Sequence, residues 1–196
     1  LKVNFNTELY DVDSSGVYLI GTPAIGNLDD DAELEVVFSG YSNNNKLFVI
    51  NHDGSLVDGF PIPLYEKVKR GVALADFNNN DKDDIVLGTD DGRLYLILDN
   101  GTTASGFPYI TADKFQSAPS ILDLNGEKLI IVGNNNDTLY VITSTGNLLI
   151  DYPTEGKILS SPIFINVENV PYIIFSSADH LIHFIDIEGN PYPGWP

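Results

Sequence analysis

Two acidic segments of this chain carry the residue types and the spacing of a calcium site. The first, "NLDDDAELE", has oxygen-bearing side chains at alternate positions, namely Asn27, Asp29, Asp31, Glu33 and Glu35. The second, "DFNNNDKDD", places Asp76, Asn78, Asn80, Lys82 and Asp84 at the same positions. Ca²⁺ takes six to eight oxygen ligands, and alternate residues of a loop can turn their oxygens inward around it. The two segments therefore predict two Ca²⁺ sites.

Both segments differ from the helical EF-hand loop. Their last acid stands at the ninth position instead of the twelfth, and strand-forming residues, "VVF" and "IVL", follow it. We therefore expect each loop to pin a turn between two strands. The first loop has three carboxylates, Asp29, Asp31 and Glu35, whereas the second has two, so tighter binding is predicted at the first. Extracellular sites of this kind have Kd values of about 10⁻⁴ to 10⁻³ M.

The elements around these loops belong to an internal repeat. An aromatic residue followed by proline occurs in "DGFP", "SGFP", "IDYP" and "PGWP", and a glycine stands at a constant distance before each pair. At a constant distance before each glycine an apolar run begins, at Leu47, Leu94, Leu139 and Ile182. Two further apolar runs precede it, separated by turn-forming residues, so each copy predicts four short strands.

A repeat of about 45 residues with four strands in each copy is typical of a β-propeller. The sequence predicts an all-β fold with four four-stranded blades, at residues 21–65, 66–112, 113–157 and 158–196. Residues 1–20 fit two alternatives: a strand that closes the ring, or part of a preceding blade in a larger propeller. The aromatic-proline pair is expected to end each blade, with its ring packed between neighbouring blades.

The acidic loops and the segments that lead into them, "TPAIGNLDDD" and "SAPSILDLNG", resemble the FG-GAP or VCBS repeats of integrin-alpha-type propellers. The resemblance implies a secreted or surface-exposed, calcium-stabilised propeller that serves adhesion or ligand binding. It also implies that Glu33 and Lys82 provide only their carbonyls. Ala32 and Asp81 replace the glycine usual at the sixth position. The third copy has Leu129 in place of the last acid, and the fourth lacks the alternating oxygen-bearing residues. Metal is therefore assigned to two blades only.

No set of residues with the pattern of a known catalytic site is found, and the predicted function is non-enzymatic. His180 and His183 have H-x-x-H spacing, but they face opposite sides of an extended strand, and His183 occupies the position of Phe48, Tyr95 and Tyr140. A packing role is therefore favoured over a metal ligand. Three alternatives remain: a carbohydrate-binding or accessory region of a polysaccharide-degrading enzyme, a lyase or hydrolase with its site in the central funnel, and a quinoprotein-type propeller.

The amino-acid composition limits which kinds of molecule can be expected as binding partners. The 196 residues include 28 acidic and 10 basic side chains, for a formal charge of −18. Such a charge repels nucleic acid, which is excluded as a partner, and attracts cations. No apolar run is long enough to span a bilayer, so membrane insertion is not expected. The expected partners are a protein or glycan ligand at the cell surface, or further copies in a self-assembly.

Overall fold

The computed structural model of the chain describes residues 19–42 and 45–196. The partial blade or closing strand predicted within residues 1–20 therefore lies almost wholly outside the described residues. Within the described ranges every regular element is a strand. None of the described segments forms a helix long and apolar enough to cross a membrane.

The strands form consecutive antiparallel sheets, which we call blades 1 to 4. Blade 1 contains β1 (Ala24–Gly26), β2 (Glu35–Ser39), β3 (Lys46–Ile50) and β4 (Ile62–Pro63). Blade 2 contains β5 (Ala73–Ala75), β6 (Asp84–Gly88), β7 (Arg93–Ile97) and β8 (Tyr109–Ile110). Blade 3 contains β9 (Ser120–Leu124), β10 (Glu127–Gly133), β11 (Thr138–Thr143) and β12 (Leu148–Pro153). Blade 4 contains β13 (Ile163–Val167), β14 (Val170–Ser176) and β15 (Ile182–Asp186). The predicted all-β fold of repeated sheets is confirmed. Beyond β15, blade 4 has one bridge, between Ile185 and Pro191, in place of a fourth strand.

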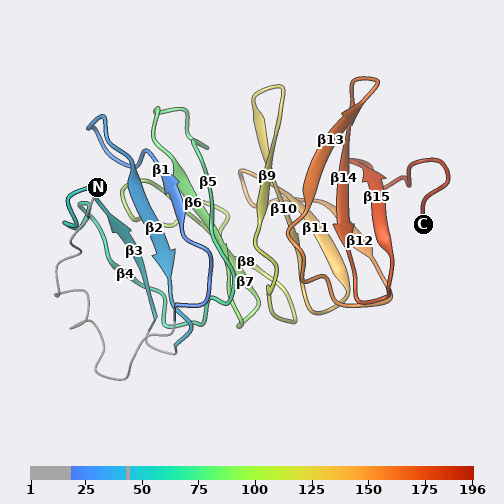
Figure 1. Cartoon of the computed structure of the whole chain (residues 1–196), viewed down its shortest axis with the longest axis horizontal. Coiled ribbons are helices and arrows are strands. Elements are labelled where there is room, and N and C mark those ends of the chain that lie inside the picture. Colours follow the sequence, from blue (N-terminus) through green and yellow to red (C-terminus); the bar gives the residue numbers. More distant parts are fainter. Residues whose placement is uncertain (1–18, 43–44) are drawn as a thin grey trace.

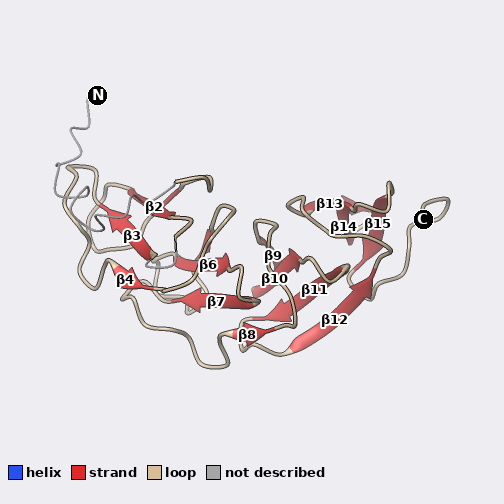
Figure 2. Ribbon diagram, turned by 90° about the horizontal axis from the view of Figure 1, so that it is seen from below, coloured by secondary structure: helices blue, strands red, loops and turns tan. Residues whose placement is uncertain are grey.

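The blades follow one another in chain order along an open arc. Figure 1 shows blade 1 and blade 4 at opposite ends of the molecule, and Figure 2 shows the curvature of the row. The first strands of successive blades are neighbours, since β5 lies beside both β1 and β9. The loops between first and second strands therefore come together at one side of the arc, and this position brings the two acidic loops close to each other.

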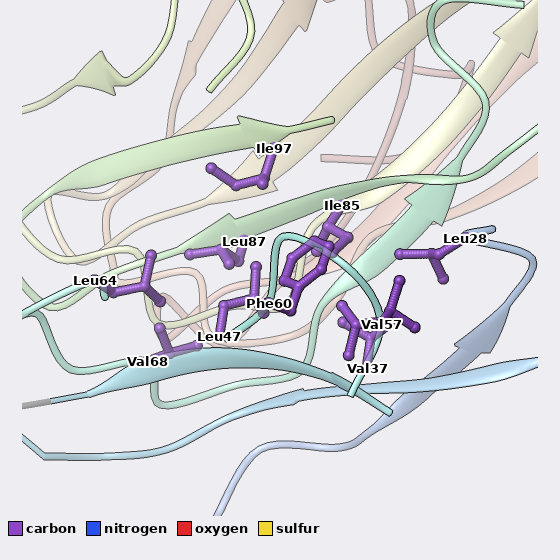
Figure 3. Close-up of a cluster of buried hydrophobic side chains, with 11 residues drawn as sticks. Leu28, Val37, Leu47, Val57, Phe60, Leu64, Val68, Ile85, Leu87 and Ile97 are labelled. Carbon is purple, nitrogen blue, oxygen red and sulfur yellow. The ribbon is translucent and has the colours of Figure 1, made fainter. Parts of the chain in front are cut away.

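An apolar core fills each junction between blades. Alternate residues of a strand point to opposite faces, so each central strand contributes to two cores. Val37, Leu47 and Val49 of blade 1 meet Ile85 and Leu87 of blade 2 in the cluster of Figure 3. A second cluster joins blades 2 and 3, and a third joins blades 3 and 4. The blades are thus held by the same kind of packing at every junction.

The aromatic-proline segment is a turn in three of the four copies. The N–H groups of Phe60, Phe107 and Trp195 each bond the carbonyl three residues earlier, and the glycine before each aromatic residue has a φ of 88 to 90°. This is the positive φ that a type II turn requires. In blades 1 and 2 the fourth strand begins after the pair, which corrects the expectation that the pair ends each blade. The third copy, "IDYP", lacks the glycine, and it lies in β12 instead.

Aromatic rings of these segments do pack between blades. Phe60 is 7% exposed in the core between blades 1 and 2. Phe107 and Tyr152 are half-buried against the second and third cores. Trp195, in contrast, is 44% exposed at the free side of blade 4, where no further blade follows among the described residues.

Candidate metal centre

The first acidic loop, residues 27–35, joins β1 to β2 and brings three carboxylates together. One oxygen from each of Asp29, Asp31 and Glu35 lies within 4.8 Å of the other two. The loop orients them through its own backbone: the N–H of Asp31 donates to Asp29 Oδ1 at 2.9 Å, and the N–H of Glu33 donates to Asp31 Oδ1 at 2.8 Å. The side chain of Glu33 is exposed, as is that of Asp31.

Glu35 is the buried member of this cluster. As the first residue of β2 it is 0% exposed, and its Oε2 accepts the N–H of Leu28 at 2.6 Å. Its Oε1 is buried and has no hydrogen-bond partner. Burial raises the pKa of Glu35, and the charges of Asp29 and Asp31 raise it further, against the lowering effect of the Leu28 N–H. An unpaired buried carboxylate oxygen is costly, because nothing replaces the water it has lost.

These three residues fit a calcium ion. Oxygens bound to one Ca²⁺ at about 2.3 to 2.6 Å lie within about 5 Å of one another, which is the separation found here. A cation at the cluster would also give Glu35 Oε1 the partner that it lacks. Asn27 is the first of the predicted ligands. Its side-chain amide donates to the carbonyl of Asp81, a residue of the other loop, at 2.8 Å.

In the second acidic loop, residues 76–84, backbone N–H groups of the loop and of Asp99 satisfy the carboxylates of Asp76 and Asp84. Asp76 accepts the N–H groups of Asn80 and Asp81, at 3.1 and 2.9 Å. Asp84, at the start of β6, accepts the N–H of Phe77 at 2.9 Å and that of Asp99 at 3.0 Å. The bond from Phe77 repeats the bond from Leu28 to Glu35, so the two loops have the same framework. Asn78 and Asn80 are exposed, and the Asn78 amide nitrogen lies 3.5 Å from Asp84 Oδ1.

The two carboxylates of the second loop have opposite pKa shifts. Burial raises the pKa of Asp76, but its backbone N–H donors outweigh that effect, so the pKa lies below the usual value. Asp84 is 0% exposed, and burial raises its pKa to about 6 although the N–H groups of Asp99 and Phe77 favour the charged form. An ion at this loop would stabilise the ionised form of Asp84, but both oxygens of Asp76 and of Asp84 already accept hydrogen bonds, unlike Glu35 Oε1.

The loops also bind each other across the junction of blades 1 and 2. The N–H of Asp83 donates to the carbonyl of Asn27 at 2.6 Å, and the N–H of Asn27 donates to Asp83 Oδ2 at 3.1 Å. Lys82 Nζ pairs with Asp30 Oδ1 at 2.8 Å. The sequence did not predict these contacts, because Asp30, Asp81 and Asp83 are not among the alternate residues that were predicted as ligands. Their only signal in the sequence was the density of acids.

Blades 3 and 4 replace the acidic loop with a two-residue hairpin turn. In blade 3, Leu124 pairs with Glu127 around Asn125 and Gly126, whose φ angles are 56 and 90°. In blade 4, Val167 pairs with Val170 around Glu168 and Asn169, at 52 and 66°. Positive φ at both central residues is the type I′ geometry of tight hairpins. These turns have no loop in which alternate residues could surround an ion.

His183 is a packing residue. It is 5% exposed, stacks on Phe175 with ring centroids 4.9 Å apart, and places Nε2 at 2.9 Å from Asp179. His180 lies in the turn before β15 with a φ of 72° and is exposed, so it is not on the strand as expected. The two histidines therefore belong to different environments, and neither lies near the acidic loops.

Comparison with known proteins identifies the fold. No family model matches the chain, and no curated protein matches it. Among solved structures it is similar to BamB from Moraxella catarrhalis, with a TM-score of 0.64 and 16% identity over 88% of this chain and 48% of that one. It is similar to the computationally designed Ika4 protein, with a TM-score of 0.58 and 16% identity over 87% of this chain and 96% of that one. A third similar structure is BBS1N in complex with ARL6DN, with a TM-score of 0.60 and 10% identity over 91% of this chain and 56% of that one.

The chain thus spans about half the length of BamB and of BBS1N. At these identities the likeness concerns the fold alone, and the resemblance to FG-GAP repeats stays a prediction. The sheets, their repeated junctions and these neighbours lead to one conclusion: the chain has a β-propeller fold and forms an arc of four blades.

Proposed function

We propose that this chain is a non-enzymatic, calcium-binding β-propeller module of a secreted or cell-surface protein, which serves adhesion, ligand binding or assembly. The observation that carries the calcium part is Glu35 Oε1, a buried carboxylate oxygen without a partner beside two further carboxylates. A structural turn needs no such group, whereas a cation site does. The first loop is the primary site and the second loop the weaker one.

In this proposal calcium stabilises the junction between blades 1 and 2. When bound, the ion neutralises acids in two loops that are hydrogen-bonded to each other through Asn27, Asp81 and Asp83. The remainder of the blade surface is then free to carry a ligand site, because loops positioned by a rigid scaffold are where propellers bind. The net charge of −18 favours a cation-rich environment and disfavours anionic partners.

The test is thermal unfolding of the chain in chelator, in millimolar CaCl₂ and in millimolar MgCl₂, combined with calorimetric titration. We expect the midpoint to rise with Ca²⁺ and to rise less with Mg²⁺, which needs a small octahedral site with several retained waters. The titration should show a tighter and a weaker site. A midpoint equal in chelator and in millimolar Ca²⁺ would refute calcium binding.

Carbohydrate binding is the second candidate, and one feature favours it. A hollow of about 410 Å³ lies beside the first loop, between blades 1 and 2, and its polar lining includes Asp58, Lys82, Asp99 and Asn100. Side chains of these types bind sugar hydroxyls through hydrogen bonds. A glycan array separates the candidates: selective binding that Asp99→Ala and Asp58→Ala abolish, with the calcium response unchanged, would favour the carbohydrate-binding function.

A further inference from the structure

The faces that the blades turn to each other follow one rule. At the junction of blades 3 and 4, blade 3 presents Leu129 and Ile131 of β10 and Leu139 and Val141 of β11. All four are at most 2% exposed. Blade 4 covers them with Ile173 and Ile185, among others, from its opposite face. Every blade therefore has a presenting face, directed to the next blade, and a receiving face, directed to the previous one.

The described residues leave the presenting face of blade 4 partly uncovered. The strand pairing shows which residues of blade 4 correspond to the presenting residues of blade 3. Leu129 pairs with Leu122 in blade 3, and Tyr172 pairs with Ile165 at the same place in blade 4. The presenting face consists of Ile163, Ile165, Tyr172, Ile174, Ile182 and Phe184. Ile163 is 61% exposed, Ile165 47% and Ile182 52%, whereas Leu139, the counterpart of Ile182, is 0% exposed. Contiguous exposed apolar side chains of this kind mark an interaction surface.

Aromatic side chains extend this face at its outer side. Tyr192 stacks on Phe184 with ring centroids 4.6 Å apart, and Trp195 meets the same ring edge-on at 5.5 Å. Trp195 is nevertheless 44% exposed. Trp and Tyr are enriched in protein interfaces because they bury a large area at a small entropic cost. The aromatic residues thus cover Phe184, which is 8% exposed, and add the exposed part of Trp195 to the apolar surface of blade 4.

The receiving face of blade 1 lies at the other end of the arc. Register places Ile25, Val36 and Phe38 at the positions that Leu74, Ile85 and Leu87 occupy in blade 2. Ile85 and Leu87 are 0% exposed against blade 1, whereas Ile25 is 65% exposed and Phe38 is half-buried. Phe48 and Ile50 of β3 lie on the same face as Phe38 and are only 4% and 0% exposed, so the open part of this face is its β1 and β2 side. One chain therefore has the two halves of a blade junction, one at each end (Figure 1).

We propose that a second copy of this chain covers these faces, with blade 4 of each copy packed on blade 1 of the other. Two copies then close a ring around a two-fold axis with two identical junctions, which is the commonest symmetry of homo-oligomers. The length of the arc agrees, since the chain matches about half of each of two longer chains, 48% of BamB and 56% of BBS1N. The inference depends on the repeat register and not on calcium binding, so the two can fail separately.

Sedimentation velocity of the chain tests this, over two decades of micromolar concentration. The ionic strength should be about 0.15 M, where a Debye length of about 8 Å screens the repulsion between two acidic copies. We expect a species of twice the 21.5 kDa chain mass. Ile182→Glu on blade 4 and Ile25→Glu on blade 1 should each shift it to the monomer. Ile110→Glu, at a 64% exposed position of β8 away from both faces, is the matched control and should leave the dimer intact.

Mixing the two variants distinguishes head-to-tail packing from other dimers. The Ile25→Glu chain keeps its presenting face, and the Ile182→Glu chain keeps its receiving face, so together they form one intact junction and should recover dimer mass. A wild-type chain that stays monomeric while its circular dichroism shows folded β-sheet overturns the proposal. So does a dimer that Ile182→Glu leaves unchanged, or a pair of monomeric variants that fail to associate on mixing.

Discussion

Replacement of Glu35 by glutamine should stabilise the chain in the absence of calcium and destabilise it, relative to the wild type, in the presence of calcium. The variant keeps an oxygen for the Leu28 N–H and adds amide donors beside Asp29 and Asp31. In chelator the free energy of unfolding should rise, because burial and the neighbouring carboxylates disfavour the ionised glutamate at neutral pH. In calcium it should fall below the wild-type value, because the buried ligand has lost its charge.

The magnitude follows from the linkage between binding and folding. For a Kd of about 10⁻⁴ M, 1 mM Ca²⁺ stabilises the folded chain by about 1.4 kcal/mol. If the substitution weakens binding about tenfold, the contribution falls to about 0.4 kcal/mol. For a chain of this size these values correspond to a midpoint shift of about 3 to 6 °C reduced to about 1 to 2 °C.

Thermal unfolding with and without calcium measures both effects, and Glu33→Gln is the matched control. It removes the same charge from the same loop, but the Glu33 side chain is exposed and is predicted to offer only its carbonyl. The control should therefore keep the wild-type calcium shift. If Glu35→Gln and Glu33→Gln respond equally to calcium, the assignment of Glu35 as a ligand is wrong.

Two further predictions concern the second loop and the blade junctions. Since the folded-state pKa of Asp84 is about 6 against 3.8, the calcium-free chain binds a proton more tightly when folded, so its stability should decrease by about 2 kcal/mol as pH rises from 4 to 7. Urea unfolding at a series of pH values measures this, and Asp84→Asn should flatten the curve; an unchanged slope would contradict the shift. Phe60→Ala should cost about 3 to 5 kcal/mol, because Phe60 is almost fully buried between blades 1 and 2, and Phe107→Ala should cost less, because Phe107 is half-buried. Equal losses in urea unfolding would show that burial at the junction does not determine the effect.

The repeat made most of the fold predictable from sequence. Residues at a constant spacing occupy equivalent places in a sheet, and the runs that begin at Leu47, Leu94, Leu139 and Ile182 all became third strands. Alternation within each run determined which residues face which junction. The fourth strands were less predictable, because β4 and β8 are two residues long and their position depends on the turn before them.

The contents of the acidic loops were predictable, but their contacts were not. Alternation of Asp29, Asp31 and Glu35 indicated that their oxygens would converge. Whether an oxygen stays without a partner depends on backbone N–H groups that come from elsewhere, such as that of Asp99 at Asp84. The bonds between Asn27 and Asp83 join positions 56 residues apart, and no local pattern encodes such a pair.

The tight hairpins of blades 3 and 4 divide the arc into two kinds of blade. A type I′ turn is held by its backbone dihedral angles and by the hydrogen bonds of the strands that it joins, and it needs no ion. The loops of blades 1 and 2 instead concentrate negative charge that their own backbone only partly compensates. If calcium binds these loops, the stability of the amino-terminal half of the arc depends on the calcium concentration, whereas that of the carboxy-terminal half does not. Depletion of the ion would then loosen the molecule from one end, beginning at blade 1, and leave blade 4 folded.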